Sequence, residues 1–195
     1  LNASVPANPL QEFIALARSR PGELNYGSAS TGGLTHLGGE IFDITAGVRM
    51  QHVPYKGGGP LIVDLIGGQV QLTFTPAINV AAHIKSGKLK AVAISGEKRF
   101  SALPQVPTFS EAGLPGYSAT NWYGVLAPAG TPKLIVGKQS AEIGKILAMS
   151  DVREKLASQA VEPFISTPEQ FAALMKADLA KFAKTIKAAN IKLEN

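Results

Sequence analysis

The stretch N-Y-G-S-A-S-T-G-G-L-T-H-L-G-G-E, residues 25–40, changes midway from a strand-like to a helix-like residue pattern. It begins with a short strand-like run, passes through glycines and hydroxyl side chains, and continues with helical spacing. A helix that begins after such a turn presents unpaired backbone N–H groups and the positive end of its dipole. The stretch therefore predicts a strand, a turn and a helix that could hold a small anion without reacting with it.

This turn nearly matches the phosphate-binding loop of nucleotide hydrolases. Gly27 and Gly32 occupy the two glycine positions of G-x-x-x-x-G-K-[ST], but Gly33 and Leu34 stand where that motif needs lysine and a hydroxyl residue. Without the lysine on the phosphates and the hydroxyl on magnesium, nucleotide hydrolysis is excluded.

The turn also nearly matches the nucleophile elbow G-x-S-x-G around Ser30, except that Ser28 replaces the first glycine. A serine hydrolase needs a base, and His36 lies too far round the same helix to meet Ser30. His52 and His83 lie on other elements with no evident aspartate partner. We therefore expect no catalysis here.

The hydroxyls of Ser28, Ser30 and Thr31 could donate to a carboxylate. The alternative interpretation is a glycine-rich turn that only packs against a neighbouring helix. His36 and Glu40, spaced i and i+4, could ligate a metal, but the sequence offers no third ligand, so we favour a structural histidine and expect no metal or cofactor.

Outward from this stretch, short strands alternate with helices, which predicts an α/β sheet covered by helices on both faces. Asn8 is the expected N-cap of a first helix with Pro9 at its first position. The expected strands are 24–27, 50–54, 70–75 and 89–94, and the later expected helices pass through Ile41 and Ile44 and cover 60–66 and 76–85.

From residue 97 the chain becomes rich in Pro, Gly and Ser, which is typical of an irregular surface connection. An extended run, 121–127, precedes Thr131 and Pro132, which we expect to open a helix. A capping box of Thr167 and Gln170 predicts a long final helix with Phe171, Leu174, Leu179, Phe182 and Ile186 on one face. We expect these later elements to complete a sheet begun elsewhere.

Composition restricts the function further. The 195 residues are 45% hydrophobic and 17% charged, enough for one large or two small packed domains. The net charge of +5 comes from dispersed lysines without interleaved aromatics, so a small anionic ligand is favoured over nucleic acid. The chain has no cysteine, no apolar run of about 18–20 residues that could insert into a membrane, and no signal-peptide pattern. Its start at Leu1 suggests processing or truncation.

A second glycine cluster, V-P-Y-K-G-G-G-P at residues 53–60, follows another expected strand and enters a helix. Its backbone N–H groups could face the same ligand cleft as those of the first glycine-rich turn. Lys56 could be the counter-charge of an anionic ligand, or it could be merely solvated. Trp122 could line a pocket, although filling the core is the more frequent role of a tryptophan.

Together, several segments closely resemble the Bug receptors, the extracytoplasmic solute-binding proteins of the tripartite tricarboxylate transporter family. These segments are residues 25–40, H-V-P-Y-K-G-G-G-P, L-I-G-G-Q-V, H-I-K-S-G-K-L-K-A-V-A-I-S, L-P-Q-V-P-T-F-S-E-A-G-L-P-G-Y, W-Y-G-V-L-A-P-A-G-T-P and V-R-E-K-L-A-S-Q-A-V-E-P. The resemblance extends, in order, over essentially all of the chain.

The resemblance implies an α/β protein of the type II periplasmic-binding-protein fold, with two lobes, a hinge and a small carboxylate between them. It implies the ligand-binding residues Ser28, Ala29, Ser30, Thr31, Gly32, Gly33, His36, Tyr55, Lys56, Gly57, Thr75, Pro76 and Trp122. Members that take acidic amino acids tend to carry Asp where this chain has Thr75, so a simple carboxylate is favoured.

Family members begin earlier than this chain. The resemblance therefore implies that residues 5–123 form one complete lobe, while residues 1–4 and 124–195 form the hinge and the C-terminal part of the other lobe, whose N-terminal part this chain lacks.

The implied function is a periplasmic receptor that delivers its solute to membrane subunits of the tripartite type, with no catalysis. Two alternatives stay open at this point: an enzyme acting on a small anion, which would need a general base in the cleft, and an interaction lobe that binds no ligand.

Overall fold

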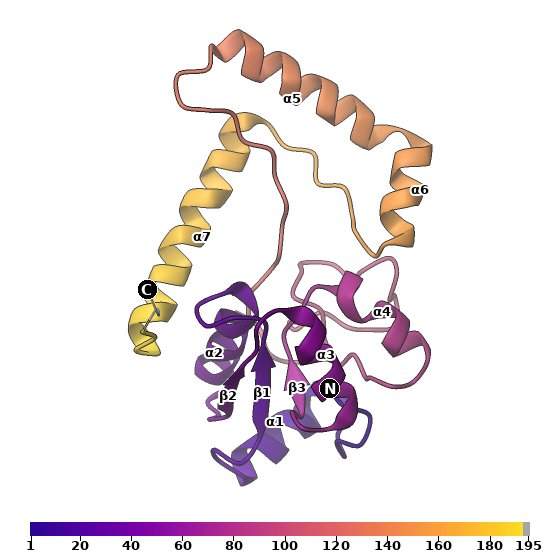
Figure 1. Ribbon diagram of the computed structural model, residues 1–195, viewed down its shortest axis with the longest axis vertical. Helices are drawn as coiled ribbons and strands as arrows, with labels where there is room; N and C mark the ends of the chain where they lie inside the picture. The colour runs from indigo at the N-terminus through magenta and orange to yellow at the C-terminus, as the bar shows by residue number, and fades with distance from the viewer. Residues whose placement is uncertain (193–195) are drawn as a thin grey trace. The chain divides into compact units, whose positions relative to one another are not determined.

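The computed structural model describes residues 1–192, in two units that are each visible in Figure 1. The first unit contains Leu1–Asn121 and the chain from Thr185 onward, and the second contains Trp122–Lys184. The predicted division of the chain into a complete lobe, 5–123, and a hinge with part of another lobe stays a prediction.

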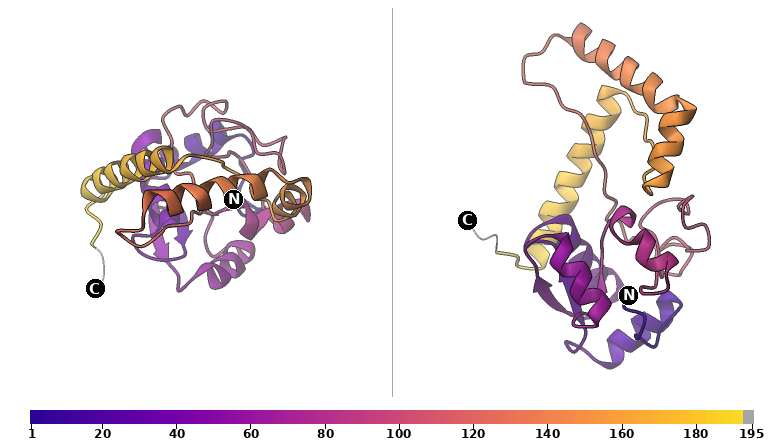
Figure 2. Two further views of the ribbon diagram at one scale, coloured as in Figure 1. Left: turned by 90° about the horizontal axis from the view of Figure 1, so that it is seen from above. Right: turned by 45° about the vertical axis from the view of Figure 1, so that its right-hand side comes forward.

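A parallel three-stranded sheet lies at the centre of the first unit. It consists of β1 (Asn25–Ser28), β2 (Gln51–Pro54) and β3 (Leu72–Thr73), in the order β2-β1-β3. Its helices are α1 (Leu10–Ser19), α2 (Leu34–Ala46), α3 (Gly58–Gly67) and α4 (Ala77–Lys85). Each strand is followed in sequence by a helix, as Figures 1 and 2 show, because parallel neighbours require a crossover connection.

The sheet separates two groups of core side chains, because successive residues of β1 point to opposite faces. Tyr26 is fully buried and faces α2, whereas the backbone of Gly27 lies against Leu61 of α3. On the α3 side the buried cluster comprises Leu61, Leu65, Val70, Val80 and Leu89. On the α2 side the aromatic rings of Phe13, Phe42, Phe74, Phe109 and Tyr117 pack together.

The predicted strand 89–94 does not form. Leu89 makes a single antiparallel bridge to Asn2, and Ile94 makes a single parallel bridge to Thr108. The segment instead bonds to irregular chain: Lys90 N–H donates to the carbonyl of Leu1 (2.8 Å), and Ile94 N–H donates to that of Pro107 (2.9 Å). These two N–H groups are therefore satisfied without a continuous neighbouring strand.

Two predicted helix starts are wrong by one residue. Pro9, not Asn8, is the N-cap of α1, and Pro132, not Thr131, is the N-cap of α5 (Lys133–Ala148), both with extended backbone. The predicted capping box is confirmed at α7 (Pro168–Ala188). Thr167 N–H donates to Gln170 Oε1 (2.9 Å), and Gln170 N–H donates to Thr167 Oγ1 (3.2 Å).

The second unit is built from helices and extended chain. It contains α5, α6 (Ser150–Ser158) and most of α7, and no strand occurs within its described residues. Leu179, predicted on the apolar face of the last helix, is 72% exposed. Further exposed apolar side chains in this unit are Tyr123, Val125, Leu126, Leu134, Ile135, Ile146, Met149, Phe164 and Ile165.

We expect backbone amides of α5 and α6 to exchange with deuterium much faster than those of α2 and α3. Neither α5 nor α6 contains a buried residue, whereas α2 and α3 contribute several to the core, and local opening is easiest where few buried contacts resist it. Hydrogen exchange followed by mass spectrometry checks this. Equal protection in the four helices would contradict it.

Candidate functional site

The three parallel strands end at the same edge of the sheet, and each end is followed by a loop and a helix N-terminus. The loops are residues 29–33 before α2, 55–57 before α3 and 74–76 before α4. In open α/β sheets, ligands bind at this carboxyl edge. The sheet thus assembles the predicted residues of its three loops from distant parts of the sequence (Figure 2).

Backbone hydrogen bonds join the first two loops. Tyr55 N–H donates to the carbonyl of Ser28 (2.9 Å), and Gly57 N–H donates to that of Ala29 (2.9 Å). The Tyr55 hydroxyl is held away from the loops by donating to Asp64 Oδ2 of α3 (2.9 Å). The two glycine-rich segments singled out in the sequence therefore form one continuous surface.

The third loop joins this surface through β3. Thr73 Oγ1 donates to the carbonyl of Gly27 (2.8 Å), which ties β3 to the end of β1. Thr75 and Pro76 follow directly, and the Thr75 hydroxyl accepts a hydrogen bond from Asn79 Nδ2 in the first turn of α4 (3.2 Å). Both residues are half-buried.

The three helices that begin at this edge have Gly33, Gly57 and Pro76 as N-caps, and none of these caps supplies a side-chain hydrogen bond. The first N–H groups of a helix have no partner inside the helix, so they are donors for a ligand. Three helix dipoles that begin at one edge make it electropositive and suited to a small anion. Lys56, which is exposed, adds a formal charge.

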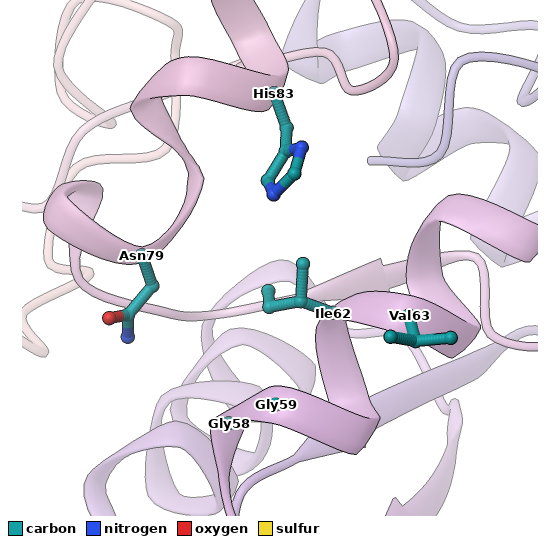
Figure 3. A pocket seen from close by; sticks show the side chains of 6 residues that line it. All are labelled: Gly58, Gly59, Ile62, Val63, Asn79 and His83. Atoms are coloured by element: carbon teal, nitrogen blue, oxygen red, sulfur yellow. The ribbon is translucent and has the colours of Figure 1, made fainter.

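A shallow hollow of about 410 Å³ lies between α3 and α4 (Figure 3). It begins at the N-terminal turn of α3 and extends to the last turn of α4, where the ring of His83 points toward it. Its lining consists of Gly58, Gly59, Ile62, Val63, Asn79 and His83. The mixed lining offers room beside the helix N-termini.

The predicted ligand-binding residues differ in exposure. Ser30 is exposed, and the other residues of the loop 29–33 are half-buried, so a solute can reach them. Ser28 is fully buried and His36 is only 5% exposed. We therefore place the side chains of Ser28 and His36 beneath the loop, not among the groups that a solute meets first.

Beneath the loop lies a buried polar network that the sequence did not predict. His36, in the first turn of α2, and His52, on β2, stack with ring centroids 3.6 Å apart and an interplanar angle of 5°. His36 Nδ1 accepts a hydrogen bond from Gly32 N–H (2.9 Å), and its Nε2 lies 3.4 Å from Glu40 Oε1. The Tyr26 hydroxyl also donates to Glu40.

The network contains a serine–histidine contact that the sequence did not predict. Ser28 Oγ lies 2.6 Å from His52 Nε2. Ser28 Oγ also lies 3.0 Å from the carbonyl oxygen of Ser30, so its one proton can go to either acceptor, depending on the tautomer of His52. Because Ser28 is fully buried, this contact does not present a nucleophile to a solute.

Burial sets the charges in this network. Burial, followed by the neighbouring His36, lowers the pKa of His52 from 6.5 to about 4. The hydrogen bond from His36 is the main reason that the pKa of Glu40 lies below its ordinary value. Burial, and then the hydrogen bond to Glu40, raise the pKa of Tyr26. Near neutral pH the network therefore contains a neutral His52, an ionised Glu40 and a protonated Tyr26.

Asp43, one turn beyond Glu40 on α2, gives a pH-dependent prediction. Burial raises its pKa from 3.8 to about 7, although Oδ2 accepts a hydrogen bond from Met50 N–H (2.8 Å). Oδ1 is buried without a partner among the described residues. The folded chain binds this proton more tightly than the unfolded chain, so the stabilisation is complete below about pH 3.8 and is lost as the pH rises through 7.

We therefore expect Asp43→Asn to raise the melting temperature at pH 8 relative to the wild type, and to raise it less at pH 4. The amide keeps an oxygen for Met50 and carries no charge to desolvate. Calorimetry of both chains at several pH values checks this. A difference between variant and wild type that does not change with pH would contradict the assignment.

Trp122 belongs to the second unit, so its predicted place in the ligand cleft stays a prediction. Within that unit its ring packs edge-on against Phe171, with centroids 5.0 Å apart, and its indole N–H donates to Asp178 Oδ2 (2.8 Å).

The described part of the chain, residues 1–192, has no group of three or more His, Asp or Glu side chains arranged to hold a metal ion. None of its helices combines the length and the apolar character that crossing a bilayer requires.

Glycine loops and helix N-termini at the carboxyl edge of a parallel sheet give the first unit an edge that is chemically suited to a small anion. The sequence profile of the family described as "Tripartite tricarboxylate transporter family receptor" matches residues 1–191, and the chain belongs to this family. The predicted resemblance to the Bug receptors is thereby confirmed.

Individual relatives agree with this assignment. BugT of Bordetella pertussis (strain Tohama I) is 34% identical over 193 residues, which are 99% of this chain and 59% of BugT. The solved structure of R. palustris Rpa4515 with adipate matches with a TM-score of 0.85 and 34% identity, over 97% of this chain and 64% of that one. MatC from Rhodopseudomonas palustris with bound malate matches with a TM-score of 0.78 and 30% identity, over 95% and 64%.

The periplasmic binding protein BugD also matches, with a TM-score of 0.81, 30% identity, and coverage of 99% of this chain and 65% of BugD. These neighbours confirm the predicted α/β fold of the periplasmic binding proteins. The chain spans less than two thirds of the length of BugT, Rpa4515, BugD and MatC.

Proposed function

We propose that this protein is a periplasmic receptor that binds a small organic carboxylate and delivers it, chemically unchanged, to membrane subunits of a tripartite tricarboxylate transporter. The observation that carries the proposal is the accessible carboxyl edge of the sheet, where the loops 29–33, 55–57 and 74–76 lead into three helix N-termini. Backbone N–H groups in this arrangement suit the two oxygens of a carboxylate.

The comparisons support the ligand class. The structures of Rpa4515 and MatC, which are similar to this chain, contain adipate and malate, and both ligands are dicarboxylates. A simple carboxylate is favoured over an acidic amino acid because Thr75 offers no negative charge to an ammonium group. The transporter subunits and the periplasmic location follow from family membership and are part of the proposal.

The site also favours binding over catalysis. Ser28 is fully buried beneath the loop, and His36 is buried and already bonded to Gly32 and Glu40. Neither side chain therefore offers a solute the nucleophile or the general base that the enzyme alternative needs.

Calorimetric titration with adipate, malate and aspartate, followed by mass spectrometry of the recovered solute, tests the proposal. The neutral diamide of adipate is the matched control, because it keeps the length and removes the charge. We expect saturable binding of an unaltered carboxylate and no binding of the diamide. Consumption of the solute, or equal binding of the diamide, would overturn the proposal.

A further inference from the structure

His36 bonds to the candidate ligand loop from below. Its Nδ1 accepts the Gly32 N–H at 2.9 Å, four residues earlier in the chain, while the imidazole is buried and stacked on His52. A ring nitrogen that accepts from an N–H carries a lone pair and no proton. The neutral ring must therefore carry its proton on Nε2.

The groups around His36 favour that tautomer. On α2 itself, Glu40 Oε1 lies 3.4 Å from His36 Nε2 and can accept its proton, and Asp43 lies one turn further on. From β1, the Tyr26 hydroxyl donates to the same Glu40 oxygen and holds it in place. From β2, His52 stacks on the ring without bonding to Nδ1 or Nε2. The hydrogen-bonded series from Tyr26 through Glu40 to His36 thus places the ring proton on Nε2 and leaves Nδ1 as an acceptor for Gly32.

Gly32 is the residue where the loop turns. Its φ of +75° lies in the left-handed region, directly before Gly33, the N-cap of α2. The bond to His36 fixes the peptide group that enters this turn, because the six atoms of a peptide are coplanar. The directions of the N–H groups that follow, at the start of α2, depend on that peptide plane.

We infer that His36 is a positioning residue. Its Nδ1 holds the Gly32 peptide in the orientation from which the loop presents its backbone donors to a carboxylate, and Glu40 and Tyr26 hold the tautomer that makes this possible. The role rests on the proposed function. It differs from the direct ligand contact that the resemblance implies for His36, because the side chain acts through Gly32 and from beneath the loop.

Two substitutions test the roles of the two ring nitrogens of His36 separately. In His36→Asn, the side-chain oxygen lies near the position of Nδ1 and can accept from Gly32. In His36→Gln, the longer amide reaches the position of Nε2 and can face Glu40, but leaves Gly32 without its acceptor. Both variants lose the imidazole and its stacking on His52, so they are controls for one another.

Adipate and malate affinities of both variants test the role, with exchange of the Gly32 amide followed by NMR in the unliganded chains. We expect the Asn variant to stay within about threefold of the wild type and the Gln variant to bind about tenfold more weakly, since an unsatisfied buried donor costs about one order of magnitude or more. The Gly32 amide should exchange faster only in the Gln variant.

Equal affinity losses in the two variants, or a Gln variant that binds as the wild type does, would overturn the positioning role while the proposed function stands. A wild-type chain that binds no carboxylate would overturn the proposed function instead. In that case the Gly32 amide still decides the positioning role, because equal exchange in both variants would show that Nδ1 does not hold the loop.

Discussion

Replacing Gly39 with alanine is expected to lower the free energy of unfolding by about 2 kcal/mol. A Cβ at this position of α2 would lie 2.2 Å from Cε2 and 2.5 Å from Cζ of Tyr26. The Tyr26 ring is fully buried, and its hydroxyl donates to Glu40, so the ring cannot swing aside without breaking that bond. The clash outweighs the gain of about 0.5–1 kcal/mol that alanine brings to a helix interior.

Gly67→Ala is the matched control, because Gly67 also lies in a helix, α3, and a Cβ there would meet nothing within 4 Å. The control should be unchanged or slightly more stable. Urea unfolding followed by circular dichroism measures both. If Gly39→Ala proves as stable as Gly67→Ala, the close packing of α2 on Tyr26 is not what requires glycine at residue 39.

The local features of this protein could be predicted from its sequence. The glycine-rich turn before α2, the second cluster before α3 and the capping box of α7 each depend on residues a few positions apart, so short-range chemistry identifies them. The position of the loops at one edge of the sheet could also be predicted. Strands that alternate with helices pair in parallel, so their carboxyl ends lie on the same side.

The buried network under the loop could not be predicted in the same way. It depends on the register between β1 and β2, which places Tyr26 opposite His52. It also depends on the packing of α2 against the sheet, which brings the His36 ring next to the rings of Tyr26 and His52. A one-residue shift in register would turn His52 to the other face of the sheet. No local pattern specifies that register, so Ser28 and His52 could not be paired from the sequence.

The failed strand at 89–94 has a related cause. Its residues have strand-like character, but whether a strand forms depends on a partner at the sheet edge. Here Leu1 and the segment around Thr108 supply isolated hydrogen bonds to Lys90 and Ile94 instead. The strand prediction from propensity was therefore wrong, because within the described residues no strand lies beside this segment to pair with it.

The second large effect is expected from Gly32→Ala, which should weaken carboxylate binding more than tenfold if the proposed function holds. Gly32 has a φ of +75°, which a residue with a Cβ adopts at a cost of about 1 kcal/mol or more. The variant can relieve that strain by rotating the peptide that bonds to His36. The rotation would turn the backbone donors at the start of α2 away from a bound carboxylate.

Gly47→Ala separates strain from binding, because Gly47 has a similar φ of +62° but lies at the C-cap of the same helix, away from the carboxyl edge. We expect both variants to lose about 1 kcal/mol of stability and only Gly32→Ala to lose affinity, as measured by urea unfolding and adipate titration. Unchanged affinity in Gly32→Ala would mean that this peptide does not orient the ligand. Equal losses of affinity in both would mean that general destabilisation of α2, not the geometry of the loop, weakens binding.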